Sequence, residues 1–481
     1  MKSMNRREFL ILTAGSAATA AMPFGGCEKE LAGRGNGTVK RPNIIYILAD
    51  DLGYGDLGCY GQKTIKTDNI DRMAAEGMRF TQHYAGSTVC APSRCTLMTG
   101  LHTGKATVRG NSGKIEGRVP LRTSDVTIAE MLKRAGYATA LVGKWGLGEE
   151  RTTGFPNKKG FDYFFGYLNQ THAHNYYPAF LWRNNKKVAL GNEVVRPKSG
   201  YAQGYGGAST KCVDYSHDIF TREAFDFIDK SRHRPFFLYL AYTIPHANNE
   251  ARILDRHGME VPDYGIYKDK DWPEAQKGHA AMITRMDRDI GRLLGRLKKL
   301  GLDESTLVMF SSDNGPHREG GARPEFFNSG GSLRGIKRDL YEGGIRVPMI
   351  ARWPGKIKAG SVSNHVSAFW DILPTCAEVA VFKSPENIDG ISMIPTLLGQ
   401  AEQQKKHKFL YWEFHEGGFK QAVRMGEWKA VRLGPGEPLE LYNLVEDIAE
   451  KQNVAAQHPE VIAKIESYLR TARTHSPNWP V

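Results

Sequence analysis

The sequence predicts an α/β fold with a mostly parallel sheet flanked by helices, followed by a smaller C-terminal α+β unit. Apolar runs typical of buried parallel strands alternate with helical patterns over most of the chain. Near residue 405 this alternation gives way to short strand patterns separated by glycine-bearing turns. With 481 residues, the chain is long enough for one large domain and one small one.

Five apolar runs are the strand candidates of the larger unit. They are Asn43–Leu48, Ala138–Val142, Phe236–Tyr242, Thr306–Phe310 and Val347–Ala351. Two helical patterns between them are well defined. Val126–Arg134 has Ser124 or Asp125 as N-cap and Gly136 as the stop, and Met282–Leu300 is apolar on one face and basic on the other.

The smaller unit is predicted from three short strand patterns and one helical pattern. The strands are Phe409–Phe414, Gln421–Met425 and Trp428–Arg432, and the helix covers His458–Ala472. This order predicts a small antiparallel sheet with one helix packed on it. We therefore predict a large unit over residues 41–404 and a small unit over 405–481.

The N-terminus is typical of an export signal. Arg6-Arg7 precedes an apolar stretch over Leu10–Met22, which indicates a twin-arginine signal, with an ordinary export signal as the alternative. Cys27 stands where a lipoprotein signal places its lipidated cysteine. We predict a signal over residues 1–27, a polar linker over 28–40, and a bacterial protein that is periplasmic or anchored in the outer membrane.

Charge and cysteine content narrow the classes of partner. Lys and Arg number 65 against 52 Asp and Glu, giving a net charge of +13, which favours anionic partners such as a sulfated polymer. No basic run or aromatic-laced basic stripe is present, so nucleic acid is not expected. Beyond Cys27, the cysteines are Cys59, Cys90, Cys95, Cys212 and Cys376. Their odd number and scattered spacing indicate neither a disulfide framework nor a zinc ribbon.

Polar residues follow four of the predicted strands. They are Asp50-Asp51, Lys144, His246 and Asp313-Asn314. Each alone reads as an ordinary turn, cap or loop residue, but ligands of open α/β sheets bind beyond the carboxyl ends of the strands. Three carboxylates and an amide meeting there would form an oxygen cage for a hard divalent cation, calcium or magnesium. Zinc would favour histidine or cysteine ligands.

Cys90 is the candidate nucleophile. In Cys90-Ala91-Pro92-Ser93-Arg94, proline and serine suit the opening of a helix, whose N-terminus favours an anion. Arg94 is close enough to hold an oxyanion. The spacing alone indicates only an activated thiol, and the alternative is a small buried hydrophobic residue.

The segment from Cys90 to Arg94, followed by Leu97-Met98-Thr99-Gly100, resembles the signature of the type I sulfatases, in which the cysteine is converted to formylglycine. Other family segments follow in order. They are Arg41-Pro42-Asn43-Ile44 through Gly53, Gly143-Lys144-Trp145, Thr243-Ile244-Pro245-His246, Ser312-Asp313-Asn314-Gly315, and Lys337 with Tyr341–Pro348. The resemblance covers roughly residues 41–475, and within the family the chain looks like a bacterial arylsulfatase A-like member.

The resemblance implies an alkaline-phosphatase-like fold and a role for each site residue. Calcium, or less expectedly magnesium, would be held by Asp50, Asp51, Asp313, Asn314 and residue 90. Cys90 would be modified by a formylglycine-generating enzyme. Arg94, Lys144 and Lys337 would share the charge of the sulfuryl oxygens, and His246 would protonate or polarise the departing oxygen.

The sequence departs from the family pattern at Gly146, where many members carry a histidine that contacts formylglycine. His172, His174 and His317 are candidate substitutes, and an ordinary surface loop is the alternative for His172 and His174. Arg183 belongs to an aromatic-basic loop that could hold a charged sugar. These four residues form the predicted substrate-binding set.

Three functions compete. The first is a sulfatase acting on a sulfated carbohydrate or small sulfate ester, with galactose or N-acetylgalactosamine 4-sulfate as the expected substrate. The second is a phosphonate or phosphodiester hydrolase on the same scaffold. The third is a non-catalytic glycan-binding relative.

Overall fold

The computed structural model describes residues 41–113, 118–198 and 205–481, and residues 41–481 form one compact unit. The predicted signal, the linker and Cys27 lie outside the described residues. Among the described residues, no helix has the length and apolar character needed to cross a membrane.

The strands of the described chain form one large sheet, a two-stranded ribbon and one small sheet. The large sheet contains β1 (Asn43–Ala49), β2 (Met78–Tyr84), β3 (Ala138–Lys144), β4 (Tyr163–Tyr167), β5 (Phe180–Arg183), β6 (Lys186–Ala189), β9 (Phe236–Ala241), β10 (Thr306–Ser312), β11 (Arg346–Arg352), β12 (Ser361–Ser363) and β13 (Ser367–Ala368). The ribbon pairs β7 (Glu193–Val195) with β8 (Ala208–Lys211). The small sheet contains β14 (Leu410–Phe414), β15 (Lys420–Met425), β16 (Trp428–Arg432) and β17 (Glu440–Asn443).

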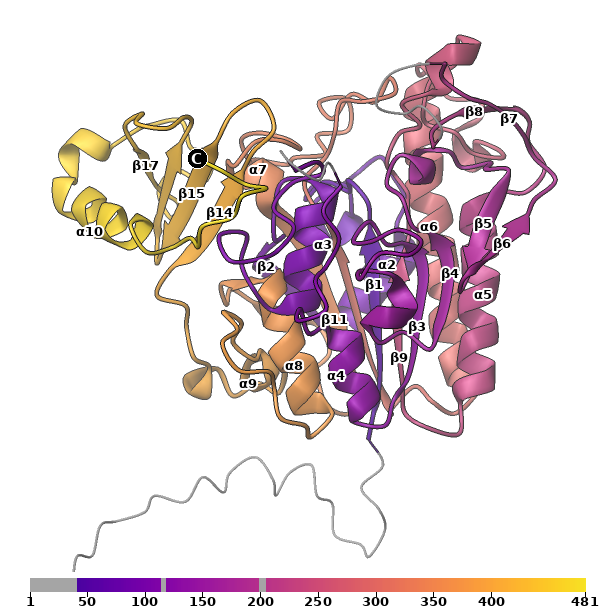
Figure 1. The fold of residues 1–481 in the computed structure, drawn as a ribbon, viewed down its shortest axis with the longest axis horizontal. Coiled ribbons are helices and arrows are strands. Elements are labelled where there is room, and N and C mark those ends of the chain that lie inside the picture. The colour runs from indigo at the N-terminus through magenta and orange to yellow at the C-terminus, as the bar shows by residue number, and fades with distance from the viewer. Residues whose placement is uncertain (1–40, 114–117, 199–204) are drawn as a thin grey trace, which may run out of the picture. The chain divides into compact units, whose positions relative to one another are not determined.

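The α-helices lie between these strands in the chain. They are α2 (Asp68–Ala75), α3 (Cys90–Thr99), α4 (Ile128–Arg134), α5 (Ser216–Ser231), α6 (Glu274–Lys299), α7 (Glu342–Ile345), α8 (Ile372–Val379), α9 (Ile394–Leu397) and α10 (Pro459–Leu469). Figure 1 shows this arrangement.

The centre of the large sheet is parallel. β1 lies between β9 and β10, and β3 and β4 extend the sheet beyond β9, all in parallel pairs. Side chains of β1 alternate between the two faces of the sheet, as in any strand. Ile45 and Ile47 pack with residues of α5 and α6, while Tyr46 and Leu48 pack with residues of α3, α4 and α8. Helices therefore cover both faces, and the predicted fold class is confirmed (Figure 1).

One predicted strand of the large sheet runs the other way. β11 is antiparallel to both β10 and β2. A completely apolar run does not distinguish the two directions, because a strand covered on both faces is apolar whichever way it runs.

The predicted helix boundaries shift by local chemistry. α4 is capped by Thr127, and not by Ser124 or Asp125, through a capping box in which Thr127 and Glu130 exchange side-chain and backbone hydrogen bonds. α6 begins at Glu274, about two turns before the predicted start. The earlier turns were missed because they bury polar residues such as Gln276, whose side chain donates to Gly321 O (2.8 Å).

Thr127→Ala is expected to lower the free energy of unfolding by about 1 kcal/mol, since it removes the acceptor of the Glu130 N–H. Ser124→Ala is the matched control, because Ser124 is exposed and outside the capping box, and it should be neutral. Urea or thermal unfolding of both variants checks this. Equal losses for the two variants would show that the cap contributes nothing specific.

The small sheet is antiparallel throughout, as predicted, and α10 packs on it. The fourth strand, β17, was not predicted, because only its two central residues are buried. Trp412 Nε1 donates to Ala85 O (2.9 Å), and Arg109 pairs with Glu413 (3.1 Å), so this sheet is attached to the segments on either side of α3. The division at residue 405 stays a prediction.

Candidate active site

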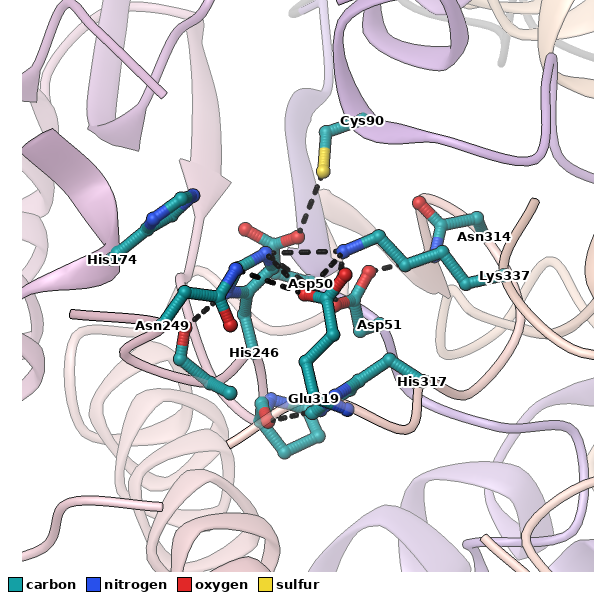
Figure 2. Close-up of polar contacts among 12 residues, drawn as sticks. Asp50, Asp51, Cys90, His174, His246, Asn249, Asn314, His317, Glu319 and Lys337 are labelled. Atoms are coloured by element: carbon teal, nitrogen blue, oxygen red, sulfur yellow. Dashed lines mark hydrogen bonds and ion pairs between the residues drawn. The ribbon is translucent and has the colours of Figure 1, made fainter. Parts of the chain in front are cut away.

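The carboxyl ends of β1 and β10 bring four oxygen-bearing side chains together. Ala49 pairs with Ser312 in parallel register, so Asp50-Asp51 and Asp313-Asn314 leave the sheet side by side. The backbone N–H of Asp51 donates to Asp313 Oδ1 (3.1 Å), and Asn314 Nδ2 donates to Asp51 Oδ1 (2.7 Å). All four residues are fully buried, and Figure 2 shows three of them beside the other site residues.

Cys90 is the first residue of α3 and faces this cluster. Its Sγ lies 3.4 Å from Asp50 Oδ1, and the residue is buried (Figure 2). Burial, and next the Asp50 carboxylate, raise the pKa of the Cys90 thiol well above its usual value. The thiol is therefore protonated in this environment, unlike the low-pKa thiolates of cysteine-dependent enzymes.

Three buried cations contact the three carboxylates. Arg94 donates to Asp313 Oδ2 through Nε (3.0 Å) and Nη2 (2.8 Å). Lys144 Nζ donates to Asp50 Oδ2 (2.6 Å), and Lys337 Nζ donates to Asp51 Oδ2 (2.9 Å). Buried charges need such partners, and together these three side chains place positive charges near residue 90.

The donor atoms of this cluster fit a hard divalent cation. Asn314 Oδ1 is buried and has no hydrogen-bond partner among the described residues. Burial, and next the Asp50 charge, raise the pKa of Asp313 to about 7, so this carboxylate would be stabilised in its charged form by a further positive charge. The Asp50, Asp51 and Asp313 carboxylates and the Asn314 amide are oxygen donors, as calcium and magnesium prefer. These four residues therefore suit the calcium that the resemblance implies.

His246 presents one ring nitrogen to the site. Nδ1 donates to Ala247 O (2.7 Å), and Nε2 lies 3.2 Å from Lys337 Nζ and 3.5 Å from Asp51 Oδ2. Figure 2 shows the contact between His246 and Lys337. Both residues line the same cavity as Cys90, so they face an incoming substrate as a pair.

Of the three candidate substitute histidines, His174 lines the cavity. Its Nδ1 is 3.1 Å from Glu250 Oε2, and its ring stacks on His246 with the centroids 4.8 Å apart. His317 lies behind His246 and has both nitrogens engaged, one with Pro245 O (3.1 Å) and the other with the N–H of Glu319 (3.0 Å).

His172 and Arg183 do not line this cavity, and their role as substrate contacts stays a prediction. His172 is buried against Tyr167 and Phe180, with centroids 4.9 and 4.6 Å away. Arg183, at the end of β5, pairs with Glu223 of α5.

Gly146 occupies a backbone conformation that a histidine would rarely adopt. Its φ is 80°, in the left-handed region, and a Cβ there would lie 3.0 Å from Gln170 Nε2. Both residues line the cavity. At this position the cavity is therefore bounded by the Gly146 backbone and the neighbouring Gln170 amide.

The cavity has a volume of about 840 Å³, within the range of small-ligand sites. The sequence did not single out several of its polar lining residues, which come from distant segments. They are Asn111, Arg118, Gln170, Asn249, Glu319, Arg338 and Glu416. The position of Arg338 directly after Lys337 was one signal in the sequence that could have identified it.

Comparison with known proteins decides the family. The Sulfatase family model matches residues 42–381, and the model of the C-terminal region of N-sulphoglucosamine sulphohydrolase matches residues 336–475. The chain belongs to the sulfatase family. The predicted enzyme class, sulfuric ester hydrolase, is confirmed, and so is the resemblance to type I sulfatases.

Two curated relatives and one solved structure illustrate the similarity. An N-acetylgalactosamine-6-O-sulfatase of Bacteroides thetaiotaomicron is 32% identical over 93% of this chain and 96% of its own length. The mouse N-acetylgalactosamine-6-sulfatase is 33% identical over 82% of this chain and 72% of its own length. The crystal structure of Ps i-CgsB in complex with k-i-k-neocarrahexaose has a TM-score of 0.76, 30% identity, and coverage of 92% of this chain and 95% of that one.

Proposed function

We propose that this sulfatase removes sulfate from a galacto-configured sugar, using calcium and a formylglycine made from Cys90. The position of Cys90 carries the proposal. It lies at the N-terminus of α3 against Asp50, and the ammonium of Lys144 contacts the same carboxylate. A nucleophile placed there would meet a sulfuryl group beside both a metal-fitting cluster and fixed cations.

The residues of the chain account for binding and charge stabilisation. Arg94, Lys144 and Lys337 are already ordered, so they would offset the charge of the sulfuryl oxygens with little reorganisation. When bound, calcium would add a Lewis acid, and the hydrate of formylglycine would supply a hydroxyl nucleophile. Hydrolysis breaks the bond between sulfur and the sugar oxygen. That oxygen takes up a proton on the side of the cavity formed by His246 and Lys337.

The relatives support a sugar substrate and favour one sulfate position. Both curated relatives described above are named for the 6-sulfate of N-acetylgalactosamine, and the solved structure holds a carrageenan oligosaccharide. We therefore propose N-acetylgalactosamine 6-sulfate as the first substrate to test, ahead of the 4-sulfate expected from the sequence.

The kcat/KM for N-acetylgalactosamine 6-sulfate is expected to exceed that for the 4-sulfate by at least about 10-fold, since a cavity that holds the sugar presents one position to residue 90. Sulfate release from a panel of mono- and disaccharide sulfates measures this, with an aryl phosphodiester as the competing substrate class. Faster turnover of the 4-sulfate would reverse the position, and faster turnover of the phosphodiester would overturn the proposed function.

Export is a separate part of the proposal. The twin-arginine pattern and Cys27 support delivery to the periplasm or, after lipidation, to the outer membrane, where extracellular glycans arrive. Fractionation of cells that produce the full chain and its Cys27→Ser variant would test both steps.

A further inference from the structure

Arg338 is held in an unusual backbone conformation at the cavity. Its φ is 79°, which is uncommon for a residue with a side chain, and such conformations cluster at functional sites. Its N–H donates to Thr88 Oγ1 (2.8 Å) and lies 3.1 Å from Thr88 O. Because Thr88 is two residues before Cys90, these contacts fix Arg338 against the loop that carries the nucleophile.

The guanidinium of Arg338 is held between two carboxylates that also line the cavity. Nη1 donates to Glu319 Oε1 (2.5 Å), and Nε donates to Glu416 Oε2 (3.1 Å). Nη2 has no hydrogen-bond partner among the described residues, and the side chain is 47% exposed. The planar guanidinium of Arg338, here called the fork, is therefore oriented but retains free N–H groups.

Glu416 anchors this arrangement to the nucleophile's helix. It lies in the turn between β14 and β15, and it accepts from Asn111 Nδ2 (3.0 Å). Asn111 Oδ1 in turn accepts the N–H of Ala91, the residue after Cys90 (3.2 Å). The position of the Arg338 fork is thus tied to residue 90 through the small sheet.

The local charge limits what the fork can bind. Glu319 and Glu416 offset the guanidinium, and although Glu319 also accepts from Lys337 Nζ (3.2 Å), that ammonium is already paired with Asp51. A second anionic group would meet two carboxylates here and little uncompensated positive charge. Neutral oxygen acceptors, such as a hydroxyl or an amide carbonyl, match the free N–H groups.

We propose that Arg338 is a specificity residue that binds a neutral oxygen of the sugar whose sulfate is removed. This inference rests on the proposed function and deepens it. The expected substrate unit carries a hydroxyl or acetamido group within reach of the fork, and carries no second charge at that position.

The test compares a sugar sulfate with an aryl sulfate that has no sugar. The probes are 4-nitrophenyl sulfate and whichever of N-acetylgalactosamine 6-sulfate and 4-sulfate the wild type hydrolyses faster. Arg338→Ala should lower kcat/KM for the sugar sulfate at least about 10-fold more than for the aryl sulfate, chiefly through KM. Arg338→Lys should fall between the two, because it retains the charge but not the fork.

Arg292→Ala is the matched control, since Arg292 is a half-exposed, carboxylate-paired arginine of α6 that does not line the cavity, and it should change neither rate more than about 2-fold. Equal losses on both substrates for Arg338→Ala, or no loss on either, would overturn the inference. So would a wild type active only on the aryl sulfate. A wild type inactive on every sulfate ester would instead refute the proposed function.

Discussion

Cys90→Ser is expected to fold normally and to hydrolyse sulfate esters at least about 10³-fold more slowly than the wild type. Serine is close to cysteine in size, so the start of α3 should keep its geometry. Serine offers one hydroxyl where hydrated formylglycine offers two. A sulfate transferred to the serine oxygen has no neighbouring hydroxyl to release it and should stay attached.

Mass spectrometry supplies the readout that activity cannot. Wild type made together with a formylglycine-generating enzyme should show residue 90 as the aldehyde or its hydrate, and the serine variant should gain mass on incubation with substrate. Cys95→Ala is the control, because Cys95 lies on the same helix but packs in the core away from the cavity. It should retain modification and turnover. A fully active preparation with an intact thiol at Cys90 would exclude this mechanism.

Much of the fold was predictable from the sequence because the central strands are covered on both faces. β1, β3, β9 and β10 are buried along their whole length, and each appears as an apolar run. Strands at the margins were missed where exposure breaks that pattern. β6, for example, has no fully buried residue, so its sequence does not differ from a loop.

The centre of the site was also predictable, because its residues follow strands whose carboxyl ends share one edge of the sheet. Asp50 and Asp313 are adjacent through the register of β1 and β10 alone. The outer cavity was not predictable in this way. Glu416 and Asn111 meet across 305 positions of sequence, and only the packing of the small sheet brings them together.

The histidines show that sequence spacing also does not predict the orientation of a single side chain. His172 and His174 are two residues apart on one short helical turn, yet only His174 lines the cavity. Spacing could place both near the site but could not determine which ring turns inward. That choice depends on Glu250, whose carboxylate holds His174, and on Tyr167 and Phe180, which enclose His172.

Removal of calcium is expected to lower kcat at least about 10³-fold. Asp313→Ala is expected to lower kcat as much, and also to abolish the thermal stabilisation that added calcium gives the wild type. The variant loses an oxygen donor and leaves the buried Arg94 without the carboxylate that it contacts through two nitrogens. With calcium at about 100 times its Kd, the wild type should gain about 2.7 kcal/mol, a rise in Tm of roughly 3–5 °C.

Asn314→Ala separates metal binding from the ion pair with Arg94. Asn314 contributes the buried Oδ1 that lacks a partner and makes no contact with Arg94, so its loss should weaken the calcium response while the metal-free Tm changes less than in Asp313→Ala. Asp289→Asn is the control, because Asp289 of α6 is equally buried but pairs with His217 of α5. It should keep the full calcium shift. If metal-stripped wild type retains its rate and calcium leaves its Tm unchanged, the strand-end oxygens are held by Arg94, Lys144 and Lys337 alone, and the metal assignment is wrong.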